Sequence, residues 1–152
     1  MHLDEVREAV RSFGSRAELK IDEPDMLTLM RQADLVIGAG GVSLLERLAC
    51  GAPSITVVTS ANQRLAVQGA ARLGGTVFVG SIEELSEDRL VESIAALASD
   101  SRLRAEIAAR GPTLVDGRGC ERVANALFRL CAASRDANRD RSAEGYDEHT
   151  EP

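Results

Sequence analysis

The residues whose types and spacing suit chemistry begin at a glycine turn. Gly40 and Gly41 are followed by Val42 and Ser43, where a helical pattern begins. Glycine lets the backbone come close to phosphate oxygens, and the free amides and positive dipole end at a helix N-terminus attract anions. The Ser43 hydroxyl can add one more hydrogen bond. The pattern predicts a diphosphate-binding turn, and the alternative is a tight turn that binds no ligand.

A carboxylate follows this turn at a useful spacing. Glu46 lies three residues after Ser43, in the second turn of the same predicted helix. It could accept hydrogen bonds from both hydroxyls of a ribose, whereas a carboxylate is poorly suited to phosphate. The alternative is a solvated glutamate, which is favoured near a helix N-terminus. Further along, Asn62 and Gln63 either contact the same ligand or form a plain helix cap.

Two apolar strands must position these residues. Residues 35–37 and 55–58 are short apolar runs, typical of strands that are covered on both faces. A helix lies between them, ended by Gly51 and Pro53. Its predicted packing face consists of Leu44, Leu45, Leu48 and Ala49. Ligands of parallel sheets bind at the carboxyl ends of strands, so both turns that follow these strands should line one site.

The alternation of strands and helices predicts the fold class, an α/β protein with a Rossmann-like parallel sheet and helices on both faces. Residues 17–21 and 76–79 are further strand candidates. Four strands are few for such a sheet, and the chain begins with a helix. We therefore expect a partial domain over 1–133 that is incomplete at its N-terminus, followed by a disordered polar tail over 134–152.

The remaining helices are predicted from apolar periodicity and capping residues. The expected spans and signals are residues 3–12, a helix capped by Asp25 through Gln32, residues 62–73, a helix capped by Ser86, a helix from Asp100 ended by Gly111 and Pro112, and residues 119–133. Ser81 and Glu84 form a capping pattern just before Ser86. The cysteines at positions 50, 120 and 131 lie in helical patterns, so we expect small buried side chains and not a metal site.

Composition excludes several function classes. The net charge of −6 argues against a nucleic-acid partner, and aromatic residues make up only 3% of the 152 residues. No apolar run approaches the roughly twenty residues that a membrane-spanning helix needs. The N-terminus is too charged for a signal peptide, so a cytoplasmic location is expected. Neither a metal nor a cofactor is predicted.

Taken together, the motifs resemble a known family. The pattern is Asp25-Met26, Met30, Ala33-Asp34-Leu35, Ile37-Gly38-Ala39-Gly40-Gly41, Glu46-Arg47, Gly51-x-Pro53-Ser54 and Ala61-Asn62-Gln63. It resembles the C-terminal nucleotide-binding half of the UDP-sugar hydrolases of pseudaminic acid synthesis and of similar spore-coat polysaccharide proteins. More distantly, it is similar to the nucleotide-binding domain of GT-B glycosyltransferases. The resemblance covers about residues 17–130 and is sharpest over 25–63.

The resemblance implies a UDP-sugar site. The backbone amides of Gly41, Val42 and Ser43, next to Gly40, would meet the diphosphate, and Glu46 would hold the ribose. Ile37 and Gly38 would lie near the mouth of the site. Asn62 and Gln63 would face the sugar or the diphosphate. The family commonly has a second hydroxyl residue and an aromatic residue where this chain has Leu44 and Leu45.

No catalytic residue is assigned. The hydrolases of this family are thought to use a histidine of an N-terminal domain, whereas this chain has only His2 and His149, both in terminal segments. The expected partner is therefore an N-terminal α/β domain, on another chain or missing. Two alternatives stay open: the nucleotide-sugar-binding half of a GT-B glycosyltransferase, and a non-catalytic remnant domain.

Overall fold

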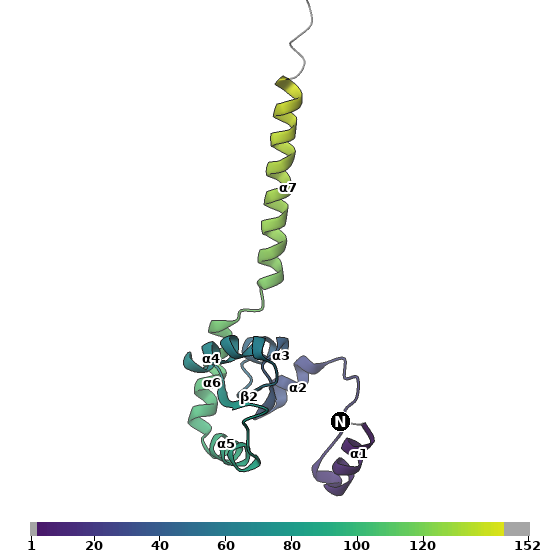
Figure 1. Ribbon diagram of the computed structural model, residues 1–152, viewed down its shortest axis with the longest axis vertical. Helices are drawn as coiled ribbons and strands as arrows, with labels where there is room; N and C mark the ends of the chain where they lie inside the picture. Colours follow the sequence, from purple (N-terminus) through teal and green to yellow (C-terminus); the bar gives the residue numbers. More distant parts are fainter. Residues whose placement is uncertain (1–2, 145–152) are drawn as a thin grey trace, which may run out of the picture.

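The computed structural model describes residues 3–144, with side chains described for residues 3–134 (Figure 1). Its centre is a three-stranded parallel sheet in the order β1 (Val36–Ala39), β2 (Ser54–Val58), β3 (Val77–Ser81). Ile37 pairs with Ile55, and Ile55 pairs with Val77. The predicted α/β class with a parallel Rossmann-like sheet is confirmed.

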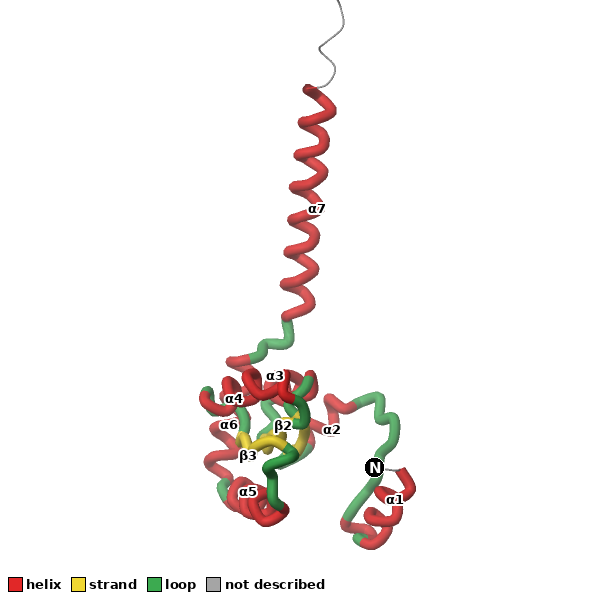
Figure 2. Tube along the Cα trace, viewed as in Figure 1, coloured by secondary structure: helices red, strands yellow, loops and turns green. Residues whose placement is uncertain are grey.

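Seven α-helices and two short 3-10 helices surround or extend from the sheet within the described residues (Figure 2). They are α1 (Leu3–Ser12), η1 (Gly14–Arg16), α2 (Met26–Gln32), α3 (Val42–Cys50), η2 (Ala61–Gln63), α4 (Arg64–Arg72), α5 (Glu87–Ser99), α6 (Ser101–Leu114) and α7 (Gly119–Glu144). The predicted caps are confirmed. The side chains of Asp25, Ser86 and Asp100 each accept a hydrogen bond from the amide three residues ahead, across 3.0, 3.3 and 2.9 Å.

Two apolar clusters cover the two faces of the sheet. One joins α3 and α4 to Val58 of β2, through Leu44, Leu48 and Val67. The other joins α5 and α6 to the opposite face, and it contains Ile55, Val57, Val79, Leu97 and Ile107. Because side chains alternate along a strand, successive residues of β2 enter different clusters. The sheet is thus sandwiched between helices, as the sequence predicts.

Helices α3 and α6 pack unusually closely, and two glycines make this possible. A Cβ on Gly111 would lie 2.4 Å from the carbonyl oxygen of Leu48, and one on Gly51 would lie 2.7 Å from that of Ala108. Gly51 ends α3 with a left-handed φ of 67°. Pro112 has no amide hydrogen to donate to Ala108, so this carbonyl is free to face Gly51.

Some boundaries differ from the sequence-based prediction. Helix α6 continues through Pro112 to Leu114, so the prediction that Gly111 and Pro112 end it was wrong. Residues 17–21 form no strand, which corrects the prediction; the edge of the sheet at β1 stays open, with β2 as its only strand neighbour among the described residues. The Ser81 hydroxyl does bond Glu84 across 2.9 Å, but this pair closes a turn and the helix begins at Glu87.

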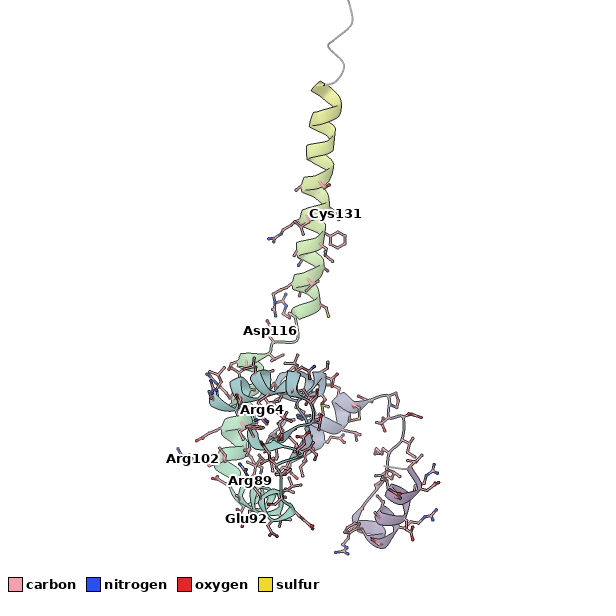
Figure 3. The ribbon with its side chains drawn as sticks, viewed as in Figure 1. Arg64, Arg89, Glu92, Arg102, Asp116 and Cys131 are labelled. Carbon is pink, nitrogen blue, oxygen red and sulfur yellow. The ribbon has the colours of Figure 1, made fainter. Side chains whose placement is uncertain are left out.

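Helix α7 extends away from the sheet and its covering helices (Figure 1). It runs to Glu144, past the predicted end at Ala133, and the remainder of the expected tail lies outside the described residues. Cys120 and Cys131 are exposed on it, which corrects the expectation that they are buried; Cys131 is labelled in Figure 3. The apolar stripe of α7 packs on no described element, and therefore these side chains remain open to solvent. No helix within residues 3–144 has the length and apolar character to cross a membrane.

Candidate functional site

The glycine turn leads from the carboxyl end of β1 into α3. Gly40 is buried, and its amide donates to the carbonyl of Val57 across 3.0 Å. A Cβ at Gly40 would lie 2.2 Å from Cγ2 of Val67, so only glycine lets the turn pass between β2 and α4. Gly40 therefore holds the turn in place by close packing, and its own amide is not available to a ligand.

The next three amides are available. Within the described residues, no hydrogen bond uses the amide of Gly41, Val42 or Ser43, whereas the amide of Leu44 donates to Gly41 across 3.0 Å. Gly41 occupies the N-cap position, and no side chain caps the helix there. These are the unpaired donors expected at a helix N-terminus, and the dipole of α3 adds positive potential at the same place.

The turn that follows β2, residues 59–63, lies next to the glycine turn that follows β1. Oε1 of Gln63 accepts hydrogen bonds from the amide and the hydroxyl of Thr59, at 3.1 and 3.2 Å. Its Nε2 lies 3.7 Å from where a Cβ of Gly41 would be. Gln63 thus brings a side-chain donor to the glycine turn. Asn62 is exposed and makes no hydrogen bond with described residues. The predicted cap is not formed by Asn62, because Gln63 occupies the N-cap position of α4. The side chain of Gln63 makes no capping hydrogen bond.

A buried arginine lies beneath the turn. Arg47 is only 2% exposed, and its guanidinium donates to Ser43 Oγ, Ala39 O and Thr56 Oγ1 at 3.2, 2.9 and 3.2 Å. A Cβ on Gly38 would lie 2.5 Å from Nη1 of Arg47, so glycine at this position of β1 makes room for the guanidinium. Sequence reasoning missed this role. The available signal was the spacing of Arg47 with Leu44 and Leu48, which places it on the apolar face of the helix.

Buried hydroxyl groups continue this network into the sheet. Thr56 Oγ1 lies 2.7 Å from Thr76 Oγ1, and the Thr76 hydroxyl donates to the carbonyl of Ser54 across 2.8 Å. Since Thr76 has one hydrogen and it is donated to Ser54, Thr56 must be the donor to Thr76. By the same reasoning the Ser54 hydroxyl donates to Thr76 Oγ1 across 3.0 Å, so donors and acceptors are assigned from Arg47 through Thr56 and Thr76 to Ser54.

Glu46 lies on a different side of α3 from the Arg47 network. Together with Ala49 and Cys50 of α3 it lines a cavity of about 290 Å³, closed from α2 by Met26, Leu27 and Met30. Glu46 is exposed, and no hydrogen bond or ion pair of the described residues involves it. The structure therefore places a free carboxylate at the edge of a mainly apolar cavity, one turn along the helix from the free amides.

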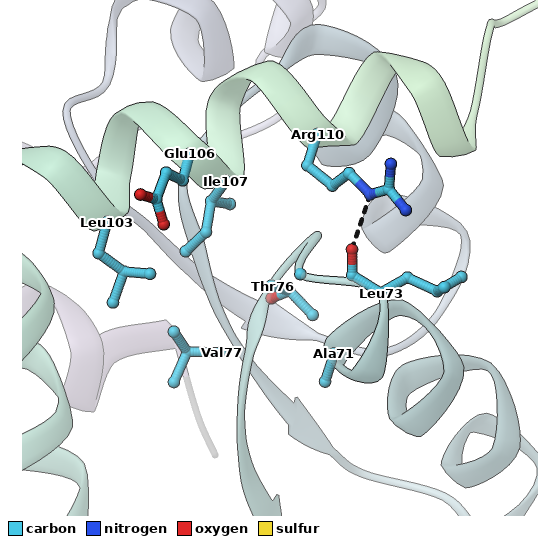
Figure 4. A pocket seen from close by; sticks show the side chains of 9 residues that line it. Ala71, Leu73, Thr76, Val77, Leu103, Glu106, Ile107 and Arg110 are labelled. Atoms are coloured by element: carbon cyan, nitrogen blue, oxygen red, sulfur yellow. Dashed lines mark hydrogen bonds between the residues drawn. The ribbon is translucent and has the colours of Figure 1, made fainter.

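Ile37 is 46% exposed on β1, at the open edge of the sheet. His2 and His149 lie outside the described residues. A second cavity, of about 360 Å³, lies at the opposite end of the strands, where Thr76 directly precedes β3 (Figure 4). There Arg110 of α6 donates to the carbonyl of Leu73 across 2.8 Å. This guanidinium is thus already engaged, unlike the free donors at the glycine turn.

The arrangement suits binding of an anion. Three backbone amides, the amide group of Gln63 and the Ser43 hydroxyl gather at the positive end of a helix, and all are hydrogen-bond donors. Among residues 3–134 no histidine or other evident general base faces this turn. The local geometry can hold an anionic ligand and orient it.

The sequence was also compared with known proteins. The model of the glycosyltransferase family 28 C-terminal domain matches residues 4–113. A curated relative is the spore coat polysaccharide biosynthesis protein SpsG of Bacillus subtilis (strain 168), which is 33% identical over 120 residues. The alignment covers 77% of this chain and 35% of that relative, so the chain spans about a third of its length.

These matches agree with the α/β fold and its parallel sheet. The family model extends from α1 through Thr113 of α6, and so it includes the whole sheet and the helices that cover it. It ends before α7. The chain belongs to the family of glycosyltransferase family 28 C-terminal domains, which have the GT-B type of α/β fold.

Proposed function

We propose that this chain binds the UDP moiety of a UDP-sugar. The diphosphate would lie on the amides of Gly41, Val42 and Ser43, and the ribose would be held by Glu46. The observation that carries this proposal is that three amides without partners and a carboxylate without a partner lie one turn apart on the same helix. Unpaired donors and acceptors of this kind gain most from a ligand that satisfies them.

The order of these groups along α3 supports a nucleotide as the ligand. Glu46 lies four residues beyond Val42, which corresponds to about 6 Å along a helix axis. The cavity beside Glu46 lies further from the turn and is lined mainly by apolar side chains. Amides, carboxylate and apolar cavity thus follow one another as diphosphate, ribose and base do in a nucleoside diphosphate. The base would enter between α2 and α3.

The other predicted residues would have supporting roles. Gln63, and with it Asn62, would face the sugar or the second phosphate. Ile37 would lie near the mouth of the site. Gly38 and Gly40 would act through the close packing that they permit, since a side chain at Gly38 would displace Arg47 and one at Gly40 would displace Val67.

The enzyme that we propose is a UDP-sugar hydrolase of the pseudaminic acid type, in which this chain is the C-terminal half. The relative named for spore coat polysaccharide biosynthesis supports a role in sugar metabolism. An N-terminal α/β domain would supply the general base that activates water.

The second candidate is the nucleotide-sugar-binding half of a glycosyltransferase, which the match to a glycosyltransferase family favours. In that reaction an acceptor hydroxyl replaces water. Release of UDP from a UDP-sugar by the complete enzyme, measured without any acceptor, separates the two. Rapid release supports the hydrolase, whereas release only after an acceptor is added supports the transferase.

Calorimetric titration with UDP tests the binding proposal itself. We expect saturable binding that Glu46→Ala weakens about tenfold, as the loss of a hydrogen bond to a charged group does. Glu92→Ala on α5 is the control, because Glu92 is exposed and lies on a helix of the opposite layer (Figure 3). Equal affinities for both variants would show that Glu46 does not hold the ribose, and a folded protein without saturable UDP binding would instead support a non-catalytic remnant.

A further inference from the structure

Arg47 carries a buried charge that no carboxylate balances. Its side chain is 2% exposed, none of the ion pairs among residues 3–134 includes it, and its buried Nε has no hydrogen-bond partner. Burial lowers the pKa of the Arg47 guanidinium from its ordinary value, and the charge of Glu46 opposes that effect. An arginine nevertheless remains protonated in proteins. A buried charge without a partner is costly, so an anion that approaches it is favoured.

The hydrogen bond from Arg47 determines whether the Ser43 hydroxyl acts as a donor or as an acceptor. A guanidinium has donors and no acceptor, so Ser43 Oγ must accept the 3.2 Å bond from Arg47. The hydroxyl hydrogen of Ser43 then has to point to another acceptor, and none of the described residues accepts a hydrogen bond from it. Ser43 lies in the first turn of α3, so its hydrogen is available on the side where the free amides lie.

Arg47 is also held rigidly in place. Its second nitrogen bonds Ala39 and Thr56, and Thr56 is fixed in turn by Thr76. The bond to Ala39 occupies a carbonyl oxygen at the end of β1 that would otherwise present negative charge near the turn. The guanidinium is thus fixed below the turn and does not need to rearrange when an anion binds, which favours tight binding.

We infer that Arg47 is a positioning residue that makes the site selective for a diphosphate over a monophosphate. It keeps the Ser43 hydroxyl as an outward donor and places an uncompensated positive charge beneath the glycine turn. The inference rests on the proposed function, since the diphosphate is taken to belong to a nucleotide at this turn. Each added phosphate brings negative charge toward the guanidinium, so the preference should grow with ligand charge.

Affinities for UDP and UMP test this inference, with Arg47→Met as the variant and Arg102→Met as the control. Arg102 is exposed on α6 and pairs with Glu106. We expect Arg47→Met to weaken UDP binding about tenfold and UMP binding much less, so that the preference for UDP falls. A residue that only supports the fold would weaken both ligands equally. That equal loss would overturn the inference.

A second variant tests the inference if Arg47→Met does not unfold cooperatively and is therefore not properly folded. Ser43→Ala keeps the bonds from Arg47 to Ala39 and Thr56, and it should also lower the preference for UDP over UMP. An unchanged preference in Ser43→Ala would contradict the inference. If the unmodified protein shows no saturable binding of UDP, the proposed function fails. If it binds UDP and both variants keep the preference for UDP over UMP, only the inferred role of Arg47 fails.

Discussion

Thr59 fixes the orientation of Gln63. The amide and the hydroxyl of Thr59 both lie within hydrogen-bonding distance of one atom of the Gln63 side chain, at 3.1 and 3.2 Å. A backbone amide can only donate, so that atom must be the oxygen Oε1. The NH2 group is then directed toward Gly41. The turn after β2 therefore contributes a donor to the turn after β1.

Gln63→Glu is predicted to weaken UDP binding while the fold is kept. A carboxylate can still accept both bonds from Thr59, but it replaces the donor near Gly41 with negative charge. We expect a loss of at least about tenfold in affinity, as for a lost hydrogen bond to a charged group. Calorimetry with Gln32→Glu as the control measures it, because the exposed Gln32 ends α2 just before the amino end of β1, whereas the glycine turn follows its carboxyl end. Equal effects of the two substitutions would argue against a role for Gln63.

Glu46 is predicted to recognise the ribose hydroxyls. If it does, the unmodified protein should prefer UDP to 2′-deoxy-UDP, which lacks one hydroxyl of the diol. Glu46→Gln should reduce this preference about tenfold, because a neutral amide accepts a hydrogen bond less strongly than a carboxylate. Competition titrations with both nucleotides provide the measurement. A preference that persists in Glu46→Gln would show that another group reads the ribose.

The close contact between α3 and α6 predicts opposite effects of two glycine substitutions. In Gly111→Ala the new methyl would meet the carbonyl of Leu48, so we expect a loss of about 1–3 kcal/mol in the free energy of unfolding. In Gly69→Ala on α4 nothing lies within 4 Å of the new methyl. That substitution should stabilise the protein by up to about 1 kcal/mol, because alanine favours the helix.

Urea denaturation of the two variants checks this prediction. Comparable destabilisation by both would mean that loss of glycine itself, and not the contact with Leu48, is responsible.

Asp116, between α6 and α7, is predicted to titrate at unusually low pH (Figure 3). Hydrogen bonds from Arg122 and then from the amide of Arg118 lower its pKa from 3.8 to about 2. A folded-state pKa below the unfolded value means that these bonds contribute to stability above pH 3.8 and are lost as the pH falls through about 2. Arg122→Gln should raise the pKa toward 3.8. Carboxyl carbon shifts against pH provide the measurement, and a value near 3.8 in the unmodified protein would contradict the prediction.

The parts of the fold that depend on local chemistry could be predicted from the sequence. Asp25, Ser86 and Asp100 cap helices because each side chain bonds an amide only three residues away. The glycine turn and the left-handed Gly51 at the end of α3 are likewise set by neighbouring residues. The convergence of the two turns followed from the parallel sheet, in which carboxyl ends of strands share one edge.

Features that depend on distant contacts could not be predicted in this way. A strand over 17–21 requires this segment to lie beside another strand, and periodicity cannot say whether it does. Local sequence predicts a helix end at Pro112, yet α6 continues to Leu114, and the carbonyl left without a donor at Ala108 faces Gly51 of another helix. Arg47 was not singled out, because its role depends on Ala39 and Thr56, which lie on two different strands.

The measurement that tests the central claim most directly is a titration of the isotope-labelled protein with UDP, followed by amide shifts. The account predicts saturable shifts that are largest for the amides of Gly41, Val42 and Ser43, with smaller changes at Glu46 and Gln63. The opposite cavity, represented by Arg110, should be unaffected. A folded sample without saturable shifts at millimolar UDP, or with shifts confined to the opposite cavity, would contradict the account.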